Sequence, residues 1–277
     1  MRGPMRVAAA NHGQEDAVLE LTTETVAFLL GAAFFAGWID AVVGGGGLVQ
    51  LPALLVALPG AAPIQILATN KFSSIFGTST SAATYVRRIG VDRATAIPLA
   101  LAAFCGSVLG ALVASRIPKE AFNPIVLVAL LLVGAYTLLR PDMGKYASVR
   151  YTGRRHTALV ALIGAIIGFY DGALGPGTGS FYVFALVGLA GYAFLDASAK
   201  AKVANVATNL AALVVFVPQG AVLWGLGLGM AAANMVGGYL GARTAVAKGS
   251  TFVRIVFMLV ITGFIIRIGY DVARDLL

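Results

Sequence analysis

Long apolar runs, separated by short polar turns, occupy most of the chain. Many of them reach about 20 residues, the length that a helix needs to cross the hydrocarbon core of a bilayer. None alternates strictly between apolar and polar positions, as the strands of a membrane β-barrel would. The hydrophobic pattern therefore predicts an all-α polytopic membrane protein. The predicted spans cover residues 64–86, 94–115 and 120–139 in the first half and 157–174, 196–217, 221–245 and 252–272 in the second.

Near the start of each half, glycines interrupt an apolar run. In the first half, the span over residues 25–43 is followed by four consecutive glycines, Gly44, Gly45, Gly46 and Gly47. Glycine has a large backbone entropy cost in a helix, so four in succession should end it. The apolar piece that follows, residues 48–58, is too short to cross a bilayer alone and ends in a Pro-Gly turn. We expect a helical hairpin or a re-entrant segment whose break lies inside the protein.

The same features return later in the chain at a constant offset in residue number. The offset that relates Asp40 to Asp171 also relates Lys71 to Lys202. This constancy predicts two homologous repeats, each made of a broken hairpin or re-entrant segment and three transmembrane helices. The second interruption contains Gly175, Gly177, Thr178 and Gly179. The predicted divisions are a polar N-terminal tail (residues 1–22), a transmembrane repeat (23–139), a basic linker (140–156) and a second transmembrane repeat (157–277).

The distribution of charge favours an orientation for these repeats. With the basic linker in the cytoplasm, the hairpin arrangement also places the basic turns near Arg88 and Lys248 inside, and the uncharged turns near Pro59 and Pro218 outside. This agrees with the positive-inside rule, whereas eight plain spans would place the turn at Lys248 outside. In this arrangement each half has five elements, namely the two arms of the hairpin and three transmembrane helices. With this odd number, the two repeats are expected to be inverted relative to each other.

Composition supports the membrane interpretation. The chain is 59% hydrophobic and 12% charged, with a mean hydropathy of +0.88, whereas a soluble domain has roughly 25% charged residues. The net charge of +8 lies largely in short loops between spans, which fits membrane orientation better than nucleic-acid binding. Cys105 is the only cysteine, so neither an intramolecular disulfide nor a cysteine metal cluster is possible. His12 and His156 lack acidic or cysteine partners at metal-binding spacing, and we expect no metal and no cofactor.

Neither glycine interruption fits a nucleotide-binding loop, because both follow apolar spans and lack the Gly-Lys-Ser/Thr ending. A helix that restarts after such a break presents unpaired N–H groups and the positive end of its dipole, which bind anions. Two such ends, one from each repeat, could converge near the middle of the bilayer. Alternatively, the glycines only permit close helix packing, which is how we interpret Gly106, Gly110, Gly237 and Gly241. No nucleophile paired with a base is identifiable, so an enzyme has no positive support.

A polar stripe follows each interruption. Lys71, Ser74 and Thr78 are spaced i, i+3 and i+7, which places them on one helix face, with Asn70 beside them. Polar side chains inside a span usually face the protein interior or a water-filled path, and a lysine above neutral donors suits an oxyanion. The alternative is that the lysines extend to the membrane interface and the other side chains bond between helices. At the same constant offset, the counterparts in the second half are Lys202, Asn205 and Asn209.

Asp40 and Asp171 are acidic residues well inside apolar spans. Each could bind a coupling proton. Each could instead have a structural role, by pairing with Lys71 or Lys202 or by capping the restarted helix. Further candidate donors near the breaks are Gln50, Tyr170 and Tyr182.

The residues around both interruptions resemble the two motifs of the sulfite exporter TauE/SafE family. Gly37-Trp-Ile-Asp40 followed by the four glycines is similar to the first motif, and Asp171 followed by Gly175-Pro-Gly-Thr-Gly179 is similar to the second. The resemblance covers nearly all of the chain from about residue 25 onward. It implies a permease of bacterial and archaeal inner membranes that moves small sulfur-containing anions, such as sulfite or sulfonates.

We therefore expect a secondary transporter, a multi-pass protein in the lipid bilayer of the inner membrane, for sulfite or an organosulfonate. The anion would bind near the midplane between the broken helices, with the two lysines offsetting its charge and the neutral stripe residues donating hydrogen bonds. One of the two aspartates could carry a coupling proton. Three alternatives stay open: a passive anion channel, uptake of the same anions instead of export, and a membrane-bound enzyme or assembly factor. The oligomeric state is also open.

Overall fold

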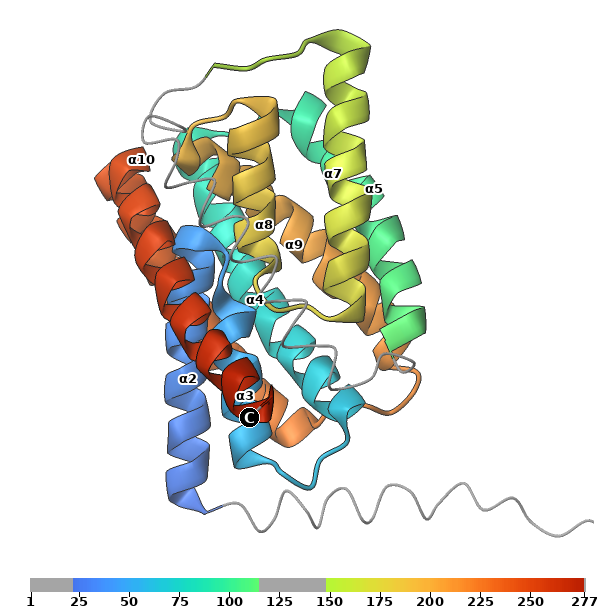
Figure 1. Ribbon diagram of the computed structural model, residues 1–277, viewed down its shortest axis with the longest axis vertical. Coiled ribbons are helices and arrows are strands. Elements are labelled where there is room, and N and C mark those ends of the chain that lie inside the picture. The colour runs from blue at the N-terminus through green and yellow to red at the C-terminus, as the bar shows by residue number, and fades with distance from the viewer. Residues whose placement is uncertain (1–21, 115–147, 277) are drawn as a thin grey trace, which may run out of the picture.

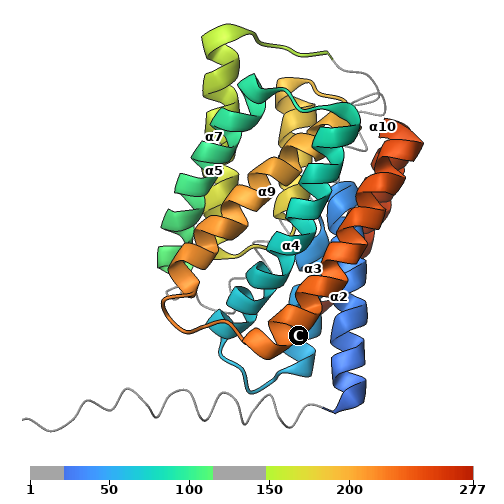
Figure 2. The same cartoon turned by 180° about the vertical axis from the view of Figure 1, so that it is seen from behind.

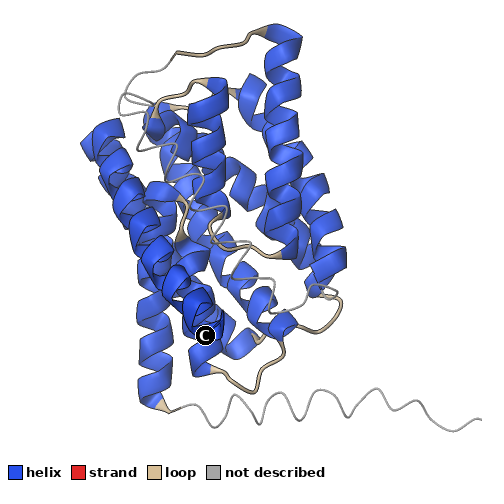
Figure 3. Cartoon of the chain, viewed as in Figure 1, coloured by secondary structure: helices blue, strands red, loops and turns tan. Residues whose placement is uncertain are grey.

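The computed structural model describes residues 22–114 and 148–276 of the chain (Figure 1). Within these residues the regular elements are helices packed side by side (Figure 2 and Figure 3). Five of them are long and apolar enough to cross a membrane, which confirms the prediction of an all-α membrane protein. The predicted span over 120–139, the tail up to residue 21 and the linker up to residue 147 lie outside the described residues.

The helices begin and end within a few residues of the predicted spans. The largest difference at the start of a helix is at α7, which begins at Gly153, inside the segment assigned to the linker. In chain order the elements are α2 (Thr23–Val43), α3 (Gly46–Ala57), α4 (Pro63–Ile89), α5 (Arg93–Val113), α7 (Gly153–Ala173), α8 (Thr178–Ala185), the short π-helix η2 (Leu186–Ala190), α9 (Phe194–Phe216) and α10 (Trp224–Leu276).

The last element, α10, contains a sharp turn at Gly249. The φ of 75° and ψ of −174° at this residue favour glycine and interrupt the helix. The chain reverses there, so that the residues after Gly249 run back toward the end of the molecule where α10 began (Figure 1). α10 therefore supplies both of the last two predicted spans, 221–245 and 252–272.

The helix α4 differs from the other long helices because it carries many polar positions. It has 27 residues, which at 1.5 Å per residue makes it about 40 Å long and sufficient to cross a bilayer. It is not among the five helices that are both long and apolar enough to be recognised as spans, because amide, ammonium and hydroxyl groups occupy its buried face, including Asn70, Lys71 and Thr78. The polar stripe predicted for this span therefore faces the protein interior.

Each glycine interruption forms the tip of a helical hairpin. The α2–α3 hairpin starts and ends at the lower end of Figure 1, whereas the α7–α8 hairpin starts and ends at the upper end. Two main-chain hydrogen bonds join the ends of the second hairpin, from Ser148 N–H to the Gly191 carbonyl (2.7 Å) and from Arg150 N–H to the Ala190 carbonyl (3.1 Å). The two hairpins thus enter the bundle from opposite ends. That they descend from one duplicated sequence stays a prediction.

Glycines allow pairs of helices to approach closely. A Cβ atom placed on Gly237 of α10 would lie 2.0 Å from the Phe34 carbonyl oxygen in α2, and one placed on Gly106 of α5 would lie 2.3 Å from the Ala165 carbonyl oxygen in α7. Phe34 and Ala165 are themselves related by the offset found in the sequence, so the α2–α10 contact recurs as the α7–α5 contact. All four glycines predicted to pack make such contacts: Gly106, Gly110, Gly237 and Gly241.

Large apolar side chains cover the outward faces of the long helices. Phe35 in α2, Leu101 in α5 and Leu259 in α10 are each more than half exposed, at 61%, 64% and 68%. A water-soluble protein rarely exposes apolar surface this extensively. Such a surface is expected where lipid is the solvent.

Candidate functional site

The tips of the two hairpins touch between the helices. α2 ends at Gly44, whose φ of 84° favours glycine and whose N–H donates to the Asp40 carbonyl. A Cβ atom on Gly44 would lie 2.1 Å from the main chain of Gly179 in α8. The Ser180 N–H donates to the Gly44 carbonyl (3.0 Å), and the Ser180 hydroxyl donates to the Val43 carbonyl (2.9 Å). Close main-chain contact therefore joins the two breaks, which explains why the tips are rich in glycine.

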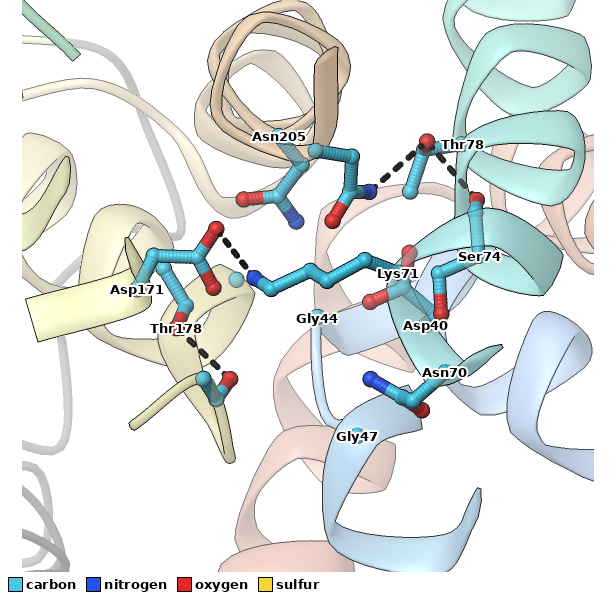
Figure 4. A pocket seen from close by; sticks show the side chains of 13 residues that line it. Asp40, Gly44, Gly47, Asn70, Lys71, Ser74, Thr78, Asp171, Thr178 and Asn205 are labelled. Atoms are coloured by element: carbon cyan, nitrogen blue, oxygen red, sulfur yellow. Dashed lines mark hydrogen bonds and ion pairs between the residues drawn. The ribbon is translucent and has the colours of Figure 1, made fainter. Parts of the chain in front are cut away.

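A cavity of about 30 Å³ lies at these tips. Its walls come from both hairpins and from the polar stripes of α4 and α9 (Figure 4). Every residue that lines it belongs to the set of site residues predicted from the sequence. The 13 lining residues are Asp40, Gly44, Gly47, Asn70, Lys71, Ser74, Thr78, Asp171, Gly175, Thr178, Gly179, Asn205 and Asn209.

Four of the predicted residues do not line the cavity: Gly45, Gly46, Gly177 and Lys202. Gly45 is the residue before α3, and Gly177, with a φ of 75°, is the residue before α8. Gly46 packs against α2, where an added Cβ atom would lie 2.6 Å from the Cβ of Asp40. These three glycines shape the breaks, while Lys202 belongs to a buried ion pair.

Two buried ion pairs cross between the halves of the chain. Lys71 Nζ lies 2.6 Å from Asp171 Oδ2, and Lys202 Nζ lies 2.7 Å from Asp40 Oδ2. The side chains of the first pair are 3% and 5% exposed, and those of the second are 0% and 15% exposed. A charge buried this deeply requires a partner. The lysines therefore do not extend to the membrane interface, and each aspartate has the lysine partner that its structural role predicts.

The two pairs differ in their access to the cavity. Lys71 lines it and points from α4 toward Asp171 (Figure 4). Lys202 does not line it, and its ammonium group also donates to the Asp40 carbonyl in the last turn of α2. A cation at this position stabilises the C-terminal end of the helix, where carbonyl groups lack partners within the helix. Of the two predicted lysines, only Lys71 can contact a molecule inside the cavity.

Neutral polar groups complete the wall of the cavity. Asn209 Nδ2 donates to the Thr78 hydroxyl (3.3 Å), which donates in turn to the Ser74 carbonyl (2.9 Å). Asn70 Oδ1 and Asn205 Oδ1 are buried and have no hydrogen-bond partner among the described residues. An amide can present its oxygen or its NH₂ group. Asn70 and Asn205 are therefore positioned to bond to a ligand or to water.

The three further candidate donors do not line the cavity: two of them donate to the main chain, and Gln50 acts as an acceptor, while its Nε2 has no partner among the described residues. The hydroxyl groups of Tyr170 and Tyr182 donate to main-chain carbonyls, at 2.7 Å and 3.3 Å. Gln50 Oε1 accepts from Asn234 Nδ2 (2.9 Å), which also bonds to a carbonyl of α2. Asn234 was not identified from the sequence, although a single amide within an apolar span was an available signal. Its contacts are structural.

A second polar cluster lies where α5 and α7 begin, away from the residues that line the cavity. The Thr95 hydroxyl lies 2.8 Å from His156 Nε2 and 2.7 Å from the Tyr192 hydroxyl. It also donates to the carboxylate of Asp92, and this bond holds the pKa of Asp92 below its usual range. His156 is thus a buried helical residue and not part of a linker, contrary to what its position in the sequence had predicted. Its partner Thr95 is distant in sequence, so no local pattern indicated the contact.

The polar groups at the cavity determine which kinds of ligand it could hold. Among the described residues, no three His, Cys, Asp or Glu side chains come together at metal-binding distances. The cavity combines the ammonium group of Lys71, the carboxylates of Asp40 and Asp171, hydroxyl and amide groups, and the first turns of two helices. Ammonium, amide and hydroxyl groups and the N-terminal ends of helices are the kinds of group that bind small oxyanions in proteins.

Comparison with known proteins agrees with this architecture. The family described as sulfite exporter TauE/SafE matches residues 29–268. A probable membrane transporter protein, ORF9, from Sinorhizobium sp is 37% identical over 257 residues, which cover 93% of this chain and 97% of the relative. The probable membrane transporter protein YfcA of Escherichia coli K12 is 34% identical over 247 residues, covering 88% and 90%. A probable membrane transporter protein of Haemophilus influenzae is 34% identical over 255 residues, covering 91% and 98%.

No solved structure matches the chain significantly. The relatives are named as membrane transporters, and the five candidate spans agree with a multi-pass membrane protein. An inner-membrane location fits these bacterial relatives. Because the family match covers most of the chain and both glycine breaks, the chain belongs to the sulfite exporter TauE/SafE family of membrane transporters.

Proposed function

We propose that this transporter moves a small sulfur-containing anion, such as sulfite or an organosulfonate, across the inner membrane by alternating access. The observation that carries the proposal is the cavity between two hairpin tips that enter from opposite ends, with Lys71 at its wall. Broken helices that meet near the midplane form the substrate sites of many secondary transporters. The description of the family as sulfite exporters supports a sulfur oxyanion.

Main-chain groups supply one part of the proposed anion site. Gly47 lies in the first turn of α3, and Thr178 and Gly179 lie in the first turn of α8; all three line the cavity. The first N–H groups of a helix lack carbonyl partners within that helix, and the helix dipole makes this end positive. An anion between the two tips would therefore meet positive ends from both hairpins.

Side chains supply the other part. Lys71 provides the positive charge in contact with the anion, while Ser74, Asn205 and Asn209 provide neutral hydrogen-bonding groups from α4 and α9. Lys202 acts indirectly, because it holds Asp40 and the end of α2 in place. This differs from the equal roles that the sequence suggested for the two lysines.

The small size of the cavity limits what it can hold in this conformation. Its volume of about 30 Å³ accommodates only a few water molecules, since each requires roughly 10–15 Å³. A sulfonate with a carbon chain would need the hairpin tips to move apart. In the proposed cycle one half of the molecule rocks against the other and opens the cavity to one side at a time.

The proposal is tested by measuring anion flux into liposomes that contain the purified protein. The panel is sulfite, thiosulfate, sulfate, taurine and sulfoacetate, each with and without a proton gradient. We expect gradient-driven accumulation of at least one sulfite or sulfonate compound. Lys71→Ala should abolish binding and flux, whereas Lys248→Ala, which removes an exposed lysine outside the cavity, should leave both unchanged.

Three results would contradict the proposal. Voltage-dependent currents without accumulation against a gradient would indicate a passive anion channel. A protein that moves none of these anions would indicate a different activity, such as an enzyme or an assembly factor. Substrate binding that survives both Lys71→Ala and Lys202→Ala would show that the anion binds elsewhere.

A further inference from the structure

The charges around the cavity sum to zero. Lys71 and Lys202 contribute two positive charges, and Asp40 and Asp171 contribute two negative charges. All four side chains are largely or fully buried, so an extra charge in the cavity would have little water to stabilise it. Entry of an anion together with one positive charge preserves this balance of formal charges, whereas entry of an anion alone does not.

From this balance we propose that each anion is transported together with one proton, that Asp171 holds this proton, and that the site selects substrates with a single negative charge. The inference rests on the proposed transport function and deepens it. It names the coupling residue, which the sequence left open between two aspartates, and it limits the substrates by charge.

The difference between the two ion pairs assigns the proton to Asp171. The ammonium group of Lys71 lies at the cavity, so an incoming anion can replace the Asp171 carboxylate beside it. Lys202 is fully buried and outside the cavity, so an anion cannot replace Asp40. Lys202 is bound to both the carboxylate and the main-chain carbonyl of Asp40, which keeps that pair together.

Within residues 22–114 and 148–276, the surroundings of Asp171 offer no second free cation once Lys71 has turned to the anion. The charged and titratable groups that interact with it are Lys71 from α4, Lys202 from α9, Tyr182 from α8 and the adjacent Tyr170. Lys202 is occupied by Asp40, which shares the cavity wall, and both tyrosine hydroxyls donate to carbonyls. A carboxylate that loses its cation in a water-poor site favours its protonated form.

The charges then balance through the whole step. One proton converts the Asp171 carboxylate to a carboxylic acid, Lys71 exchanges the carboxylate for the anion, and the sum of charges in the site stays at zero. No covalent bond other than the O–H bond of Asp171 forms. A dianion would leave one uncompensated negative charge in the cavity, so it should be excluded even when its size is suitable.

A pair of similar sulfonates provides the test in liposomes. Isethionate carries one negative charge at neutral pH, and sulfoacetate carries two. For the wild-type protein we expect one proton to enter with each isethionate, measured with an internal pH-sensitive dye, and a flux that does not change with membrane voltage. Sulfoacetate flux should be at least about tenfold slower, because its second charge would be buried without a partner.

Variants then assign the proton to one aspartate. Asp171→Asn resembles the protonated state, so it should still exchange internal for external isethionate but should lose proton-driven accumulation. The Asp40→Asn variant should still carry one proton with each isethionate in whatever flux it retains. Asp196→Asn, which changes an acid at the start of α9 outside the cavity, should match the wild type.

The wild-type measurements keep the inference testable even if a variant does not fold. Isethionate flux without proton entry, flux that varies with voltage, or equal flux of the two sulfonates would each overturn it while leaving the proposed transport function standing. The inference would also be overturned if the Asp171→Asn variant accumulated isethionate with one proton entering per anion. Failure of the wild-type protein to move any sulfur anion would instead contradict the proposed function itself.

Discussion

Lys202 illustrates how a single residue supports the site without contacting the cavity. Its side chain is completely buried, and its ammonium group bonds to the carboxylate and the carbonyl of Asp40. These bonds hold the last turn of α2 immediately before the break at Gly44. Removal of the ammonium group leaves a largely buried carboxylate without its cation, which is more damaging than removal of both charges.

We therefore predict that Lys202→Met lowers the free energy of unfolding by about 3–5 kcal/mol, the usual cost of leaving one buried charge unpaired. The double variant Asp40→Asn with Lys202→Met should recover most of this loss. Thermal and denaturant unfolding in detergent would measure both. Lys248→Met is the surface control and should be close to the wild type.

If the double variant is as unstable as the sum of the two single variants, the ion pair is not the source of the effect. A stable Lys202→Met protein would likewise contradict the structural role of this residue.

At this scale the sequence predicted which residues gather but not how they divide their roles. The spacing of Lys71, Ser74 and Thr78 correctly placed them on one helix face, which lines the cavity, and the offset pointed to Asn205 and Asn209. Helical spacing defines a face and contains no information on the partner opposite that face. Only the three-dimensional structure shows that each lysine pairs with the aspartate of the other half and that Lys202 does not line the cavity.

At the scale of helices, glycine determines how closely the hairpins and their neighbours pack. α2 packs on α10 where Gly237 faces the main chain of Phe34, and the carbonyl oxygen there would lie 2.0 Å from an added Cβ atom. This neighbour is main chain, so it cannot move aside as a flexible side chain could. Any side chain at Gly237 must push the two helices apart.

Gly237→Ala should therefore destabilise the protein by about 1–3 kcal/mol, the usual cost of overpacking, and should slow transport because α2 carries one of the two tips. Gly31→Ala in α2 is the matched control, since an added Cβ atom there meets nothing within 4 Å. Replacing this glycine should be neutral or should stabilise the helix by up to about 1 kcal/mol. Unfolding in detergent and flux in liposomes would compare the two. Equal stability of both variants would contradict the packing argument.

The sequence predicted the helices well because runs of about 20 apolar residues have few alternatives to membrane spans. It also located the two breaks, since glycine clusters have a local effect on the backbone. It did not predict the start of α7 at Gly153 or the π-helical end of the second hairpin at Leu186–Ala190. Both lie where Ser148 and Arg150 bond to residues 190 and 191, a contact between segments far apart in the chain.

At the scale of the whole molecule, basic residues gather at one end of the described bundle. Arg87 and Arg88 end α4, Arg154 and Arg155 begin α7, and Lys248 precedes the turn of α10 at the same end (Figure 1). The turns at the opposite end, residues 58–62 and 217–223, contain no charged residue. The positive-inside rule therefore predicts that the basic end lies in the cytoplasm.

Labelling of single cysteines in intact cells would test this orientation. In a background with Cys105→Ser, we expect a membrane-impermeant maleimide to label Gln219→Cys in intact cells, because this exposed position lies in an uncharged turn. Arg88→Cys should be labelled only after the membrane is permeabilised. The opposite result would reverse the orientation, and labelling of both positions from outside would contradict the arrangement of α4, α9 and the hairpins described above.

The contact between the hairpin tips has a kinetic consequence. Ser180 bonds to Gly44 and Val43 and so joins the tips of two hairpins that enter the bundle from opposite ends. If the rocking motion proposed above separates the tips in each direction, then opening toward the cytoplasm and opening toward the exterior would both break these same two bonds. The two half-cycles would then share an activation barrier, so the tip contact would set the turnover rate of the transporter without setting its direction.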